Sequence, residues 1–238
     1  MSGADPQRTR VALGLTLALL VLSNVVANRA LPSGWYVPWN LAVALALVLV
    51  ATRVGGLRPP ELGMGAGRVG AGLRWGGTVG GVVVGAVAVL AILPGTSEWF
   101  TDHAGRISTG ELLFRLLVAI PLGTVVMEEV AFRGCLLALL DAGSRCSRQR
   151  ASLVSSGLFG LWHVLPSWNI GDRNEALGSA FGETLGRWAP IAATVVATAV
   201  AGLGFVWLRR RSGSVVAPML LHQAVNAAGM VAAWLAAR

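Results

Sequence analysis

The sequence predicts an all-α, polytopic transmembrane helix bundle of about seven to eight helices, and three observations support that prediction. Hydrophobic residues make up 55% of the chain and charged residues only 13%, about half the charged share of soluble domains. The mean hydropathy is +0.67. Several apolar runs reach the ~20 residues needed to cross the hydrocarbon core of a bilayer. One fold unit is the simplest arrangement for 238 residues.

Seven apolar runs follow one another along the chain. The first follows an arginine-containing segment, PQRTR, and we interpret it as a retained helix because no A-x-A cleavage site of a signal peptide follows. The runs lie near residues 11–28, 39–51, 76–93, 111–140, 151–168, 187–208 and 214–237. Splitting the fourth run at Pro121, or counting the weak segment near 55–75, gives eight.

The stretch at about residues 54–75 differs from the runs on either side. It is rich in glycine and proline and carries arginines at regular intervals. This composition favours an interfacial or re-entrant piece over a membrane span. We therefore divide the chain into N-terminal helices that include this segment (1–110) and a helical core (111–238).

Arginine placement predicts the orientation in the membrane. All 19 basic residues are arginine, which indicates codon bias and favours a bacterial source. With the N-terminus in the cytoplasm, the inside segments hold twelve arginines and the outside segments five, as the positive-inside rule requires. We expect a multi-pass protein of the bacterial cell membrane. The net charge of +8 is thereby explained without a nucleic-acid partner.

Some polar residues have simple structural interpretations. Cys135 and Cys146 have neither CxxC spacing nor a metal-ligand pattern, so a disulfide framework is not expected. Glu111 and Arg115 are four residues apart near the outer end of their run, which indicates a boundary salt bridge. His103 is expected to face solvent.

The motif EEVAFR places three charges inside an apolar run. Glu129 and Arg133 are four residues apart and share a helix face, so a structural salt bridge explains this pair. Glu128 is turned about 100° away, and one arginine does not neutralise two carboxylates. Glu128 must therefore be protonated, face water or a cation, or pair with another helix. Such a carboxylate is suited to general-base catalysis.

Two further motifs place imidazoles inside apolar runs. FGLWH sets Phe159 and His163 four apart, and HQAVN does the same for His222 and Asn226. Taken singly, each histidine is explained by a helix–helix hydrogen bond. At ~1.5 Å per residue, however, Glu128, His163 and His222 fall roughly 16–20 Å from the cytoplasmic ends of their helices. A shared depth predicts convergence into one polar cavity.

A carboxylate, two imidazoles and an amide are suited to a peptidase that activates water. Glu128 would take a proton from water held between it and His163, while His222 and Asn226 stabilise the oxyanion. Glu129 and Arg133 would fix the helix and the local charge. In a metal-dependent alternative, Glu128, His163 and His222 bind Zn²⁺. The HExxH zinc signature is absent, and no serine triad is found.

The three motifs together resemble the CAAX prenyl-protease family of intramembrane peptidases, the CPBP group. The resemblance rests on EExxxR, FxxxH and HxxxN in this order, and it extends over about residues 111–237. It implies a helical membrane bundle with the glutamate pair at the catalytic centre, Glu128 as the base, and His163 helping to hold the water. Phe159 belongs to the same motif set. Eukaryotic members of the family remove the last three residues of prenylated CAAX proteins.

Two functional hypotheses follow. The first is an intramembrane endopeptidase acting on a membrane-associated or lipidated peptide, or on a membrane protein. The second is a non-catalytic membrane protein, such as a bacteriocin immunity factor or a proton-coupled permease. The complete motif set favours the enzyme. Membrane lipid and a peptide substrate are the expected partners, and the sequence indicates no particular oligomeric state.

Overall fold

A computed structural model describes residues 5–93, 96, 106–143, 147–168 and 188–238. Within these residues the chain is entirely helical and contains no strand. The fold is the all-α polytopic bundle that the composition predicts. His103, Cys146 and residues 169–187 lie outside the described residues.

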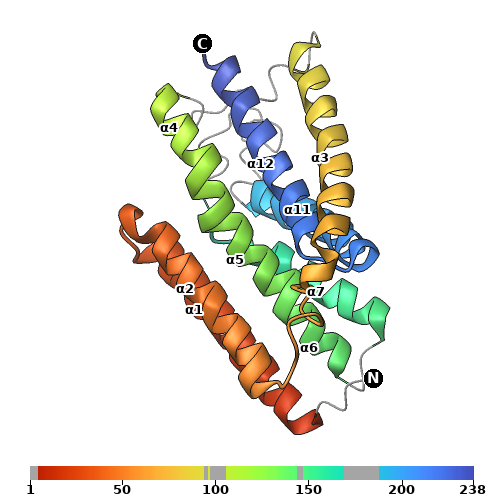
Figure 1. Cartoon of the computed structure of the whole chain (residues 1–238). Coiled ribbons are helices and arrows are strands. Elements are labelled where there is room, and N and C mark those ends of the chain that lie inside the picture. The colour runs from red at the N-terminus through yellow and green to blue at the C-terminus, as the bar shows by residue number, and fades with distance from the viewer. Residues whose placement is uncertain (1–4, 94–95, 97–105, 144–146, 169–187) are drawn as a thin grey trace.

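Seven helical stretches make up the described bundle (Figure 1). Helix α1 lies beside α2, and the helix that contains α4 to α6 runs alongside them. Helix α12 packs against α3 and α11. The bounds are α1 Pro6–Arg29, α2 Tyr36–Leu49 with a π-helical end at Val50–Val54, α3 Val69–Ile92, α4 to α6 Thr109–Ala142, α7 Arg148–Trp162, α11 Trp188–Ser212 and α12 Val216–Ala236.

Six of these helices, among the described residues, are long and apolar enough to cross a membrane. The apolar run at 151–168 corresponds to α7, which has only 15 residues, ends at Trp162 and is not among these six. A 15-residue helix is about 22 Å long, which is shorter than the ~30 Å hydrocarbon core. His163 therefore lies at the end of a helix, although the apolar run in the sequence continues to Trp168.

The fourth span is one continuous helix, so the alternative of splitting it at Pro121 is not observed. Its 34 residues, Thr109–Ala142, include π-helical stretches at Arg115–Val125 (η6) and Val130–Leu136 (η7). Proline lacks the N–H that closes a helical turn, and the wider π turn around Pro121 accommodates this loss. The glutamate pair lies in α5, Val126–Glu129, between the two π-helical stretches.

Helix α3 begins at Val69, earlier than the expected start near residue 76. Three buried glycines, Gly72, Gly76 and Gly80, form a stripe along its face toward α12. A methyl group on Gly76 would come within 2.6 Å of the Ala217 carbonyl oxygen. Small residues spaced by four allow two membrane helices to approach closely. Gly72, which lies in the segment predicted to be interfacial, is therefore one of the residues that pack this span.

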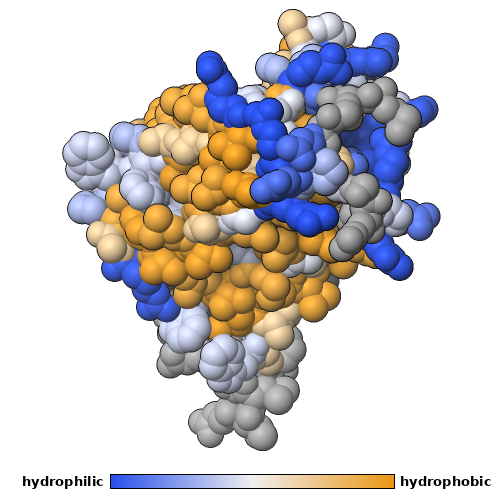
Figure 2. All heavy atoms as spheres, turned by 90° about the horizontal axis from the view of Figure 1, so that it is seen from below, coloured by the Kyte–Doolittle hydropathy of each residue, from blue (hydrophilic) through white to orange (hydrophobic). Residues whose placement is uncertain are grey.

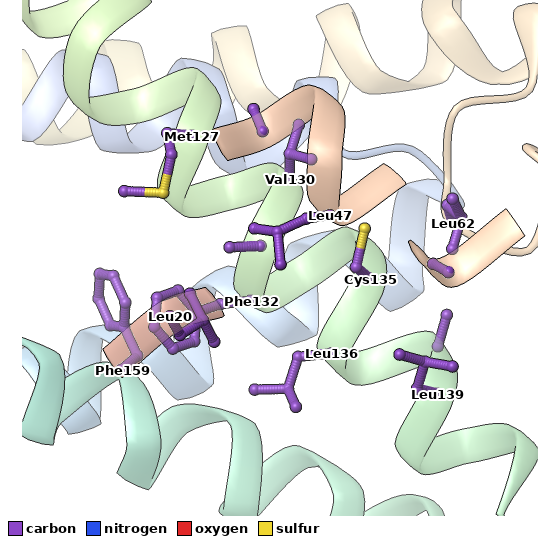
Figure 3. Close-up of a cluster of buried hydrophobic side chains, with 14 of the residues drawn as sticks. Leu20, Leu47, Leu62, Met127, Val130, Phe132, Cys135, Leu136, Leu139 and Phe159 are labelled. Atoms are coloured by element: carbon purple, nitrogen blue, oxygen red, sulfur yellow. The ribbon is translucent and has the colours of Figure 1, made fainter. Parts of the chain in front are cut away.

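The core lies around the fourth span (Figure 3). Side chains from several parts of the chain meet there, including Leu20 of α1, Leu47 of α2, Leu62 of the loop before α3, and Phe159 of α7. Phe132, which is 1% exposed, lies at their centre. This packing holds the glutamate-bearing helix against α1, α2 and α7.

The outer surface of the bundle is apolar. Val82, Ile92, Leu117 and Val196 are more than 60% exposed, and a soluble protein rarely exposes so continuous an apolar surface. Figure 2, which shows the end of the bundle where α6 ends, displays a broad apolar surface with hydrophilic residues gathered at one side. These apolar helices identify a multi-pass membrane protein.

Candidate active site

Glu128 is buried at the centre of the bundle with only part of its carboxylate bound. Its Oε1 accepts a hydrogen bond of 3.0 Å from the indole Nε1–H of Trp162. Its Oε2 has no hydrogen-bond partner among the described residues and lies 3.9 Å from Nε2 of His222. The Glu128 side chain therefore lies between α7 and α12.

Glu129 follows Glu128 in α5 and is fully buried. Its Oε1 accepts a hydrogen bond of 3.1 Å from Nη1 of Arg133 and is 2.8 Å from Nδ1 of His222. Because a carboxylate accepts hydrogen bonds, Nδ1 of His222 carries the proton in this contact. In the neutral imidazole, Nε2 is then the acceptor, and it faces Glu128. The interpretation of Glu129 with Arg133 as a salt bridge is confirmed, and His222 adds a third member.

Arg133 is fully buried among aromatic rings. Its guanidinium lies 3.9 Å from the ring centre of Phe159 and 4.9 Å from that of Phe205, where cation–π attraction offsets part of its desolvation cost. Gly202 makes this position possible, because a methyl group there would lie 3.1 Å from Nη2 of Arg133. Nε and Nη2 have no hydrogen-bond partner among the described residues.

His163 lies near this cluster but outside its hydrogen bonds. It follows the last residue of α7 and is half-buried. Its Nδ1 is 2.8 Å from the carbonyl oxygen of Phe159, and its ring contacts the Phe159 ring at 4.7 Å. Phe159 also contacts the His222 ring at 5.9 Å. Both imidazoles therefore contact the same phenyl ring.

Asn226 lies one turn after His222 on α12 and is half-buried. Its amide forms no hydrogen bond with any of the residues that the structure describes, whereas Gln223 of the same helix donates to the carbonyl oxygen of Leu116 at 2.9 Å. The Asn226 amide is therefore available to another group. Of the predicted residues, the structure joins Glu128, Glu129, Arg133 and His222 directly; Phe159 packs against them, and His163 and Asn226 lie at the margin.

The arrangement does not fit the predicted zinc ligands. In the described part of the chain, no three His, Cys, Asp or Glu side chains form a group that could hold a metal ion. An indole N–H donor occupies one oxygen of Glu128, and Nδ1 of His222 is engaged by Glu129. His163 is directed to a backbone carbonyl.

Two residues of the site were missed by reasoning from the sequence. Trp162 supplies the only donor, among the described residues, to the Glu128 carboxylate, and Phe205 stacks on His222 at 5.1 Å with an angle of 21° between the rings. Trp162 directly precedes His163 in FGLWH, so a buried indole N–H beside the motif was the available signal. No comparable pattern marked Phe205.

Comparison with known proteins assigns the chain to one family. Residues 110–228 match the model of the type II CAAX prenyl endopeptidase Rce1-like family. That match covers half of the chain and includes the EExxxR, FxxxH and HxxxN motifs. Neither the curated proteins nor the solved structures give a match. On the evidence of its own motifs and of this match, the chain belongs to the Rce1-like family of type II CAAX prenyl endopeptidases.

Proposed function

We propose that this protein is an intramembrane endopeptidase that hydrolyses a peptide bond in a membrane-associated or lipidated substrate, with water activated by Glu128. Membership of the family implies protease activity of the CAAX type in a membrane. The assignment of Glu128 as the base and of a membrane-associated or lipidated substrate is part of the proposal and does not follow from family membership alone.

One observation carries the proposal, namely the spacing between Glu128 and His222. Oε2 of Glu128 and Nε2 of His222 are 3.9 Å apart, which is too far for a direct hydrogen bond. A single water that donates one hydrogen bond to each atom fits this distance. Since Oε2 is buried and without a donor, such a water would also satisfy it. The lone pairs of this water would be free to attack a carbonyl carbon.

The proposed reaction is general-base hydrolysis. The water oxygen forms a bond to the carbonyl carbon of the scissile peptide as its proton passes to Glu128. The tetrahedral intermediate then breaks its C–N bond, and Glu128 returns the proton to the leaving amine. Trp162 holds the carboxylate in place through the bond to Oε1, so that Oε2 remains directed at the water.

The remaining residues hold and balance this centre. Glu129 fixes the tautomer of His222, as the carboxylate orients the imidazole in a catalytic triad. Arg133 compensates the charge of Glu129. Asn226, whose amide is uncommitted, is suited to donate a hydrogen bond to the oxyanion. His163 contributes to the same pocket from the end of α7. The geometry favours His222 over His163 as the holder of the water.

We place the enzyme in a bacterial cell membrane with its N-terminus in the cytoplasm. The start of α1 and the end of α12 lie at opposite ends of the bundle (Figure 1), which agrees with a C-terminus outside. The arginine distribution supports the same orientation.

The zinc-dependent alternative is tested by metal analysis of the purified protein. Equal metal content in the wild type and in a His163→Ala, His222→Ala double variant would exclude these histidines as the main ligands.

The test is cleavage of a prenylated peptide with a C-terminal CAAX sequence, together with its unprenylated counterpart, by the purified full chain in lipid vesicles. Glu128→Gln should lower kcat at least about a hundredfold, because general-base catalysis contributes 10²–10⁴-fold. Glu111→Gln is the matched control, since it removes a carboxylate from the outer end of the same helix. It should retain activity close to that of the wild type.

Two results would overturn the proposal. The first is wild-type activity in a folded Glu128→Gln protein. The second is carboxylate-dependent flux of protons or solute across vesicles with no peptide product, as expected of the permease alternative. Preference for the prenylated peptide over its counterpart would support a lipidated substrate, and equal cleavage of the two would contradict it.

A further inference from the structure

An arginine-lined pocket opens at the end of the bundle where α6 and α11 end and α7 begins. Its volume is about 400 Å³. Five arginines line it, from the segment before α3, from the start of α7 and from the end of α11: Arg68, Arg148, Arg209, Arg210 and Arg211. It lies at the opposite end of the fourth span from Glu111, and none of its residues belongs to the candidate active site.

The positive charge of this pocket is only partly neutralised. Of its two carboxylates, Asp141 binds Arg210 through two hydrogen bonds of 3.0 Å, and Glu61 pairs with Arg58, outside the pocket, at 3.4 Å. Arg68, Arg148 and Arg211 have no carboxylate partner among the described residues. A concave site with an excess of three positive charges attracts an anion.

The pocket is also held in shape. Arg209 donates to the carbonyl oxygens of Arg133 and Glu61 at 3.2 and 2.9 Å. The Arg210 guanidinium donates to the Arg148 carbonyl oxygen at 3.0 Å. Arg211 lies 5.1 Å from the ring centre of Trp75. Because Arg209, Arg210 and Arg211 are already ordered, less conformational entropy is lost when an anion binds than in a cluster of five free arginines.

The surroundings indicate which anion the pocket binds. Guanidinium groups match the oxygens of a phosphate group in pairs. Leu73 of α3 and Trp207 of α11 are each 52% exposed, and Trp207 contacts Trp75, the ring against which Arg211 lies. Figure 2 shows a broad apolar surface next to the hydrophilic residues at this end of the bundle. A phosphate in the pocket can therefore be attached to acyl chains that lie along this surface. Basic pockets at the cytoplasmic ends of membrane helices bind anionic headgroups in this way.

We propose that this pocket binds the headgroup phosphate of an anionic phospholipid. The side chains of Arg68, Arg148 and Arg211, which have no carboxylate partner among the described residues, would bind the phosphate. Arg209 and Arg210 line the same pocket and are held by hydrogen bonds. Through the bond from Arg209 to the Arg133 carbonyl oxygen, bound lipid would also be linked to the helix that carries the glutamate pair.

The test measures binding of a short-chain phosphatidylglycerol to the purified full chain in neutral detergent, from the concentration dependence of the melting temperature. Arg148→Gln removes only a charge, because the side chain of Arg148 forms no hydrogen bond within the described residues. We expect each of Arg148→Gln and Arg211→Gln to weaken binding about fivefold. Arg53→Gln, a charge removed from the same end of the bundle but outside the pocket, should change it less than about twofold.

Three further ligands identify the anion. Phosphatidylcholine should bind more weakly than phosphatidylglycerol, and diacylglycerol, which lacks the phosphate, should not bind. Inorganic phosphate at equal concentration should not displace the lipid. Displacement by inorganic phosphate would show a site for soluble anions and overturn the lipid assignment. If Arg53→Gln weakened lipid binding as much as Arg148→Gln, binding in the pocket would be contradicted, and the lipid would be held only by non-specific attraction to this end of the bundle.

Discussion

The fourth span carries two pairs of glutamate and arginine with the same spacing and very different surroundings. Glu111 and Arg115, near its N-terminal end, are 2.7 Å apart with side chains 43% and 37% exposed. Glu129 and Arg133, near its middle, are 3.1 Å apart and fully buried. The more exposed pair has the shorter contact. Distance therefore does not measure what each pair contributes.

The difference between the pairs is what else they touch. The exposed pair competes with water and gains little. The buried pair is joined by His222, and through it the arrangement extends to Glu128. A buried charge that loses its partner has no water to replace it. The same i, i+4 spacing on one helix can therefore produce either an exposed salt bridge or a buried one that is part of the proposed active site.

Removing the arginine should give the largest difference in stability between the two pairs. Arg133→Met leaves Glu129 buried without its cation, and we expect the free energy of unfolding to fall by about 3–5 kcal/mol. Arg115→Met should cost less than about 1 kcal/mol. Unfolding in mixed detergent micelles measures both. A second change, Glu129→Gln in the Arg133→Met protein, should restore part of the stability. Equal losses from the two arginine variants would contradict the comparison.

A smaller effect is expected from the hydrogen bond that distinguishes the buried centre from the exposed pair. Trp162→Phe keeps an aromatic ring but removes the donor to Oε1 of Glu128. A hydrogen bond to a charged group contributes about 1.5–3 kcal/mol, so kcat for peptide cleavage should fall at least about tenfold. The control is Trp39→Phe, which removes a bond to Ser23 away from the site. An unchanged kcat in Trp162→Phe would exclude this positioning role.

The smallest expected effect tests how tightly the buried arginine is enclosed. Gly202→Ala places a methyl group 3.1 Å from Nη2 of Arg133, and the resulting adjustment should cost about 1 kcal/mol. Gly204→Ala on the same helix meets no atom within 4 Å and should be neutral or slightly stabilising, because alanine favours helix. Melting temperatures measure both changes. Equal temperatures for the two variants would indicate that the enclosure is loose.

The sequence was sufficient for the fold class and for part of the buried polar cluster. Hydrophobic runs predict spans reliably because an isolated helix in lipid must satisfy its own backbone. The i, i+4 spacing of Glu129 and Arg133 predicts their contact because both lie on one helix. Depth counting placed Glu128 and His222 at one level of the membrane, and these side chains lie 3.9 Å apart.

Other features depended on contacts between distant segments. The end of α7 at Trp162 was not predicted because apolar composition continues beyond it, to Trp168. The first turns of α3, including Gly72, were interpreted as part of an interfacial segment, since glycine disfavours helix until another helix packs against it. The link from Trp162 to Glu128 joins two helices whose relative rotation no sequence spacing records.

By itself, the sequence determined that this chain spans a membrane and carries a buried glutamate pair with an arginine to balance one of them. Local spacing and hydropathy suffice for both, because each depends on a single helix. Only the tertiary structure decided that His222, and not His163, bridges the two glutamates, and that Trp162 holds Glu128. Those contacts depend on how α5, α7 and α12 pack, and helix packing is set by side chains far apart in the sequence.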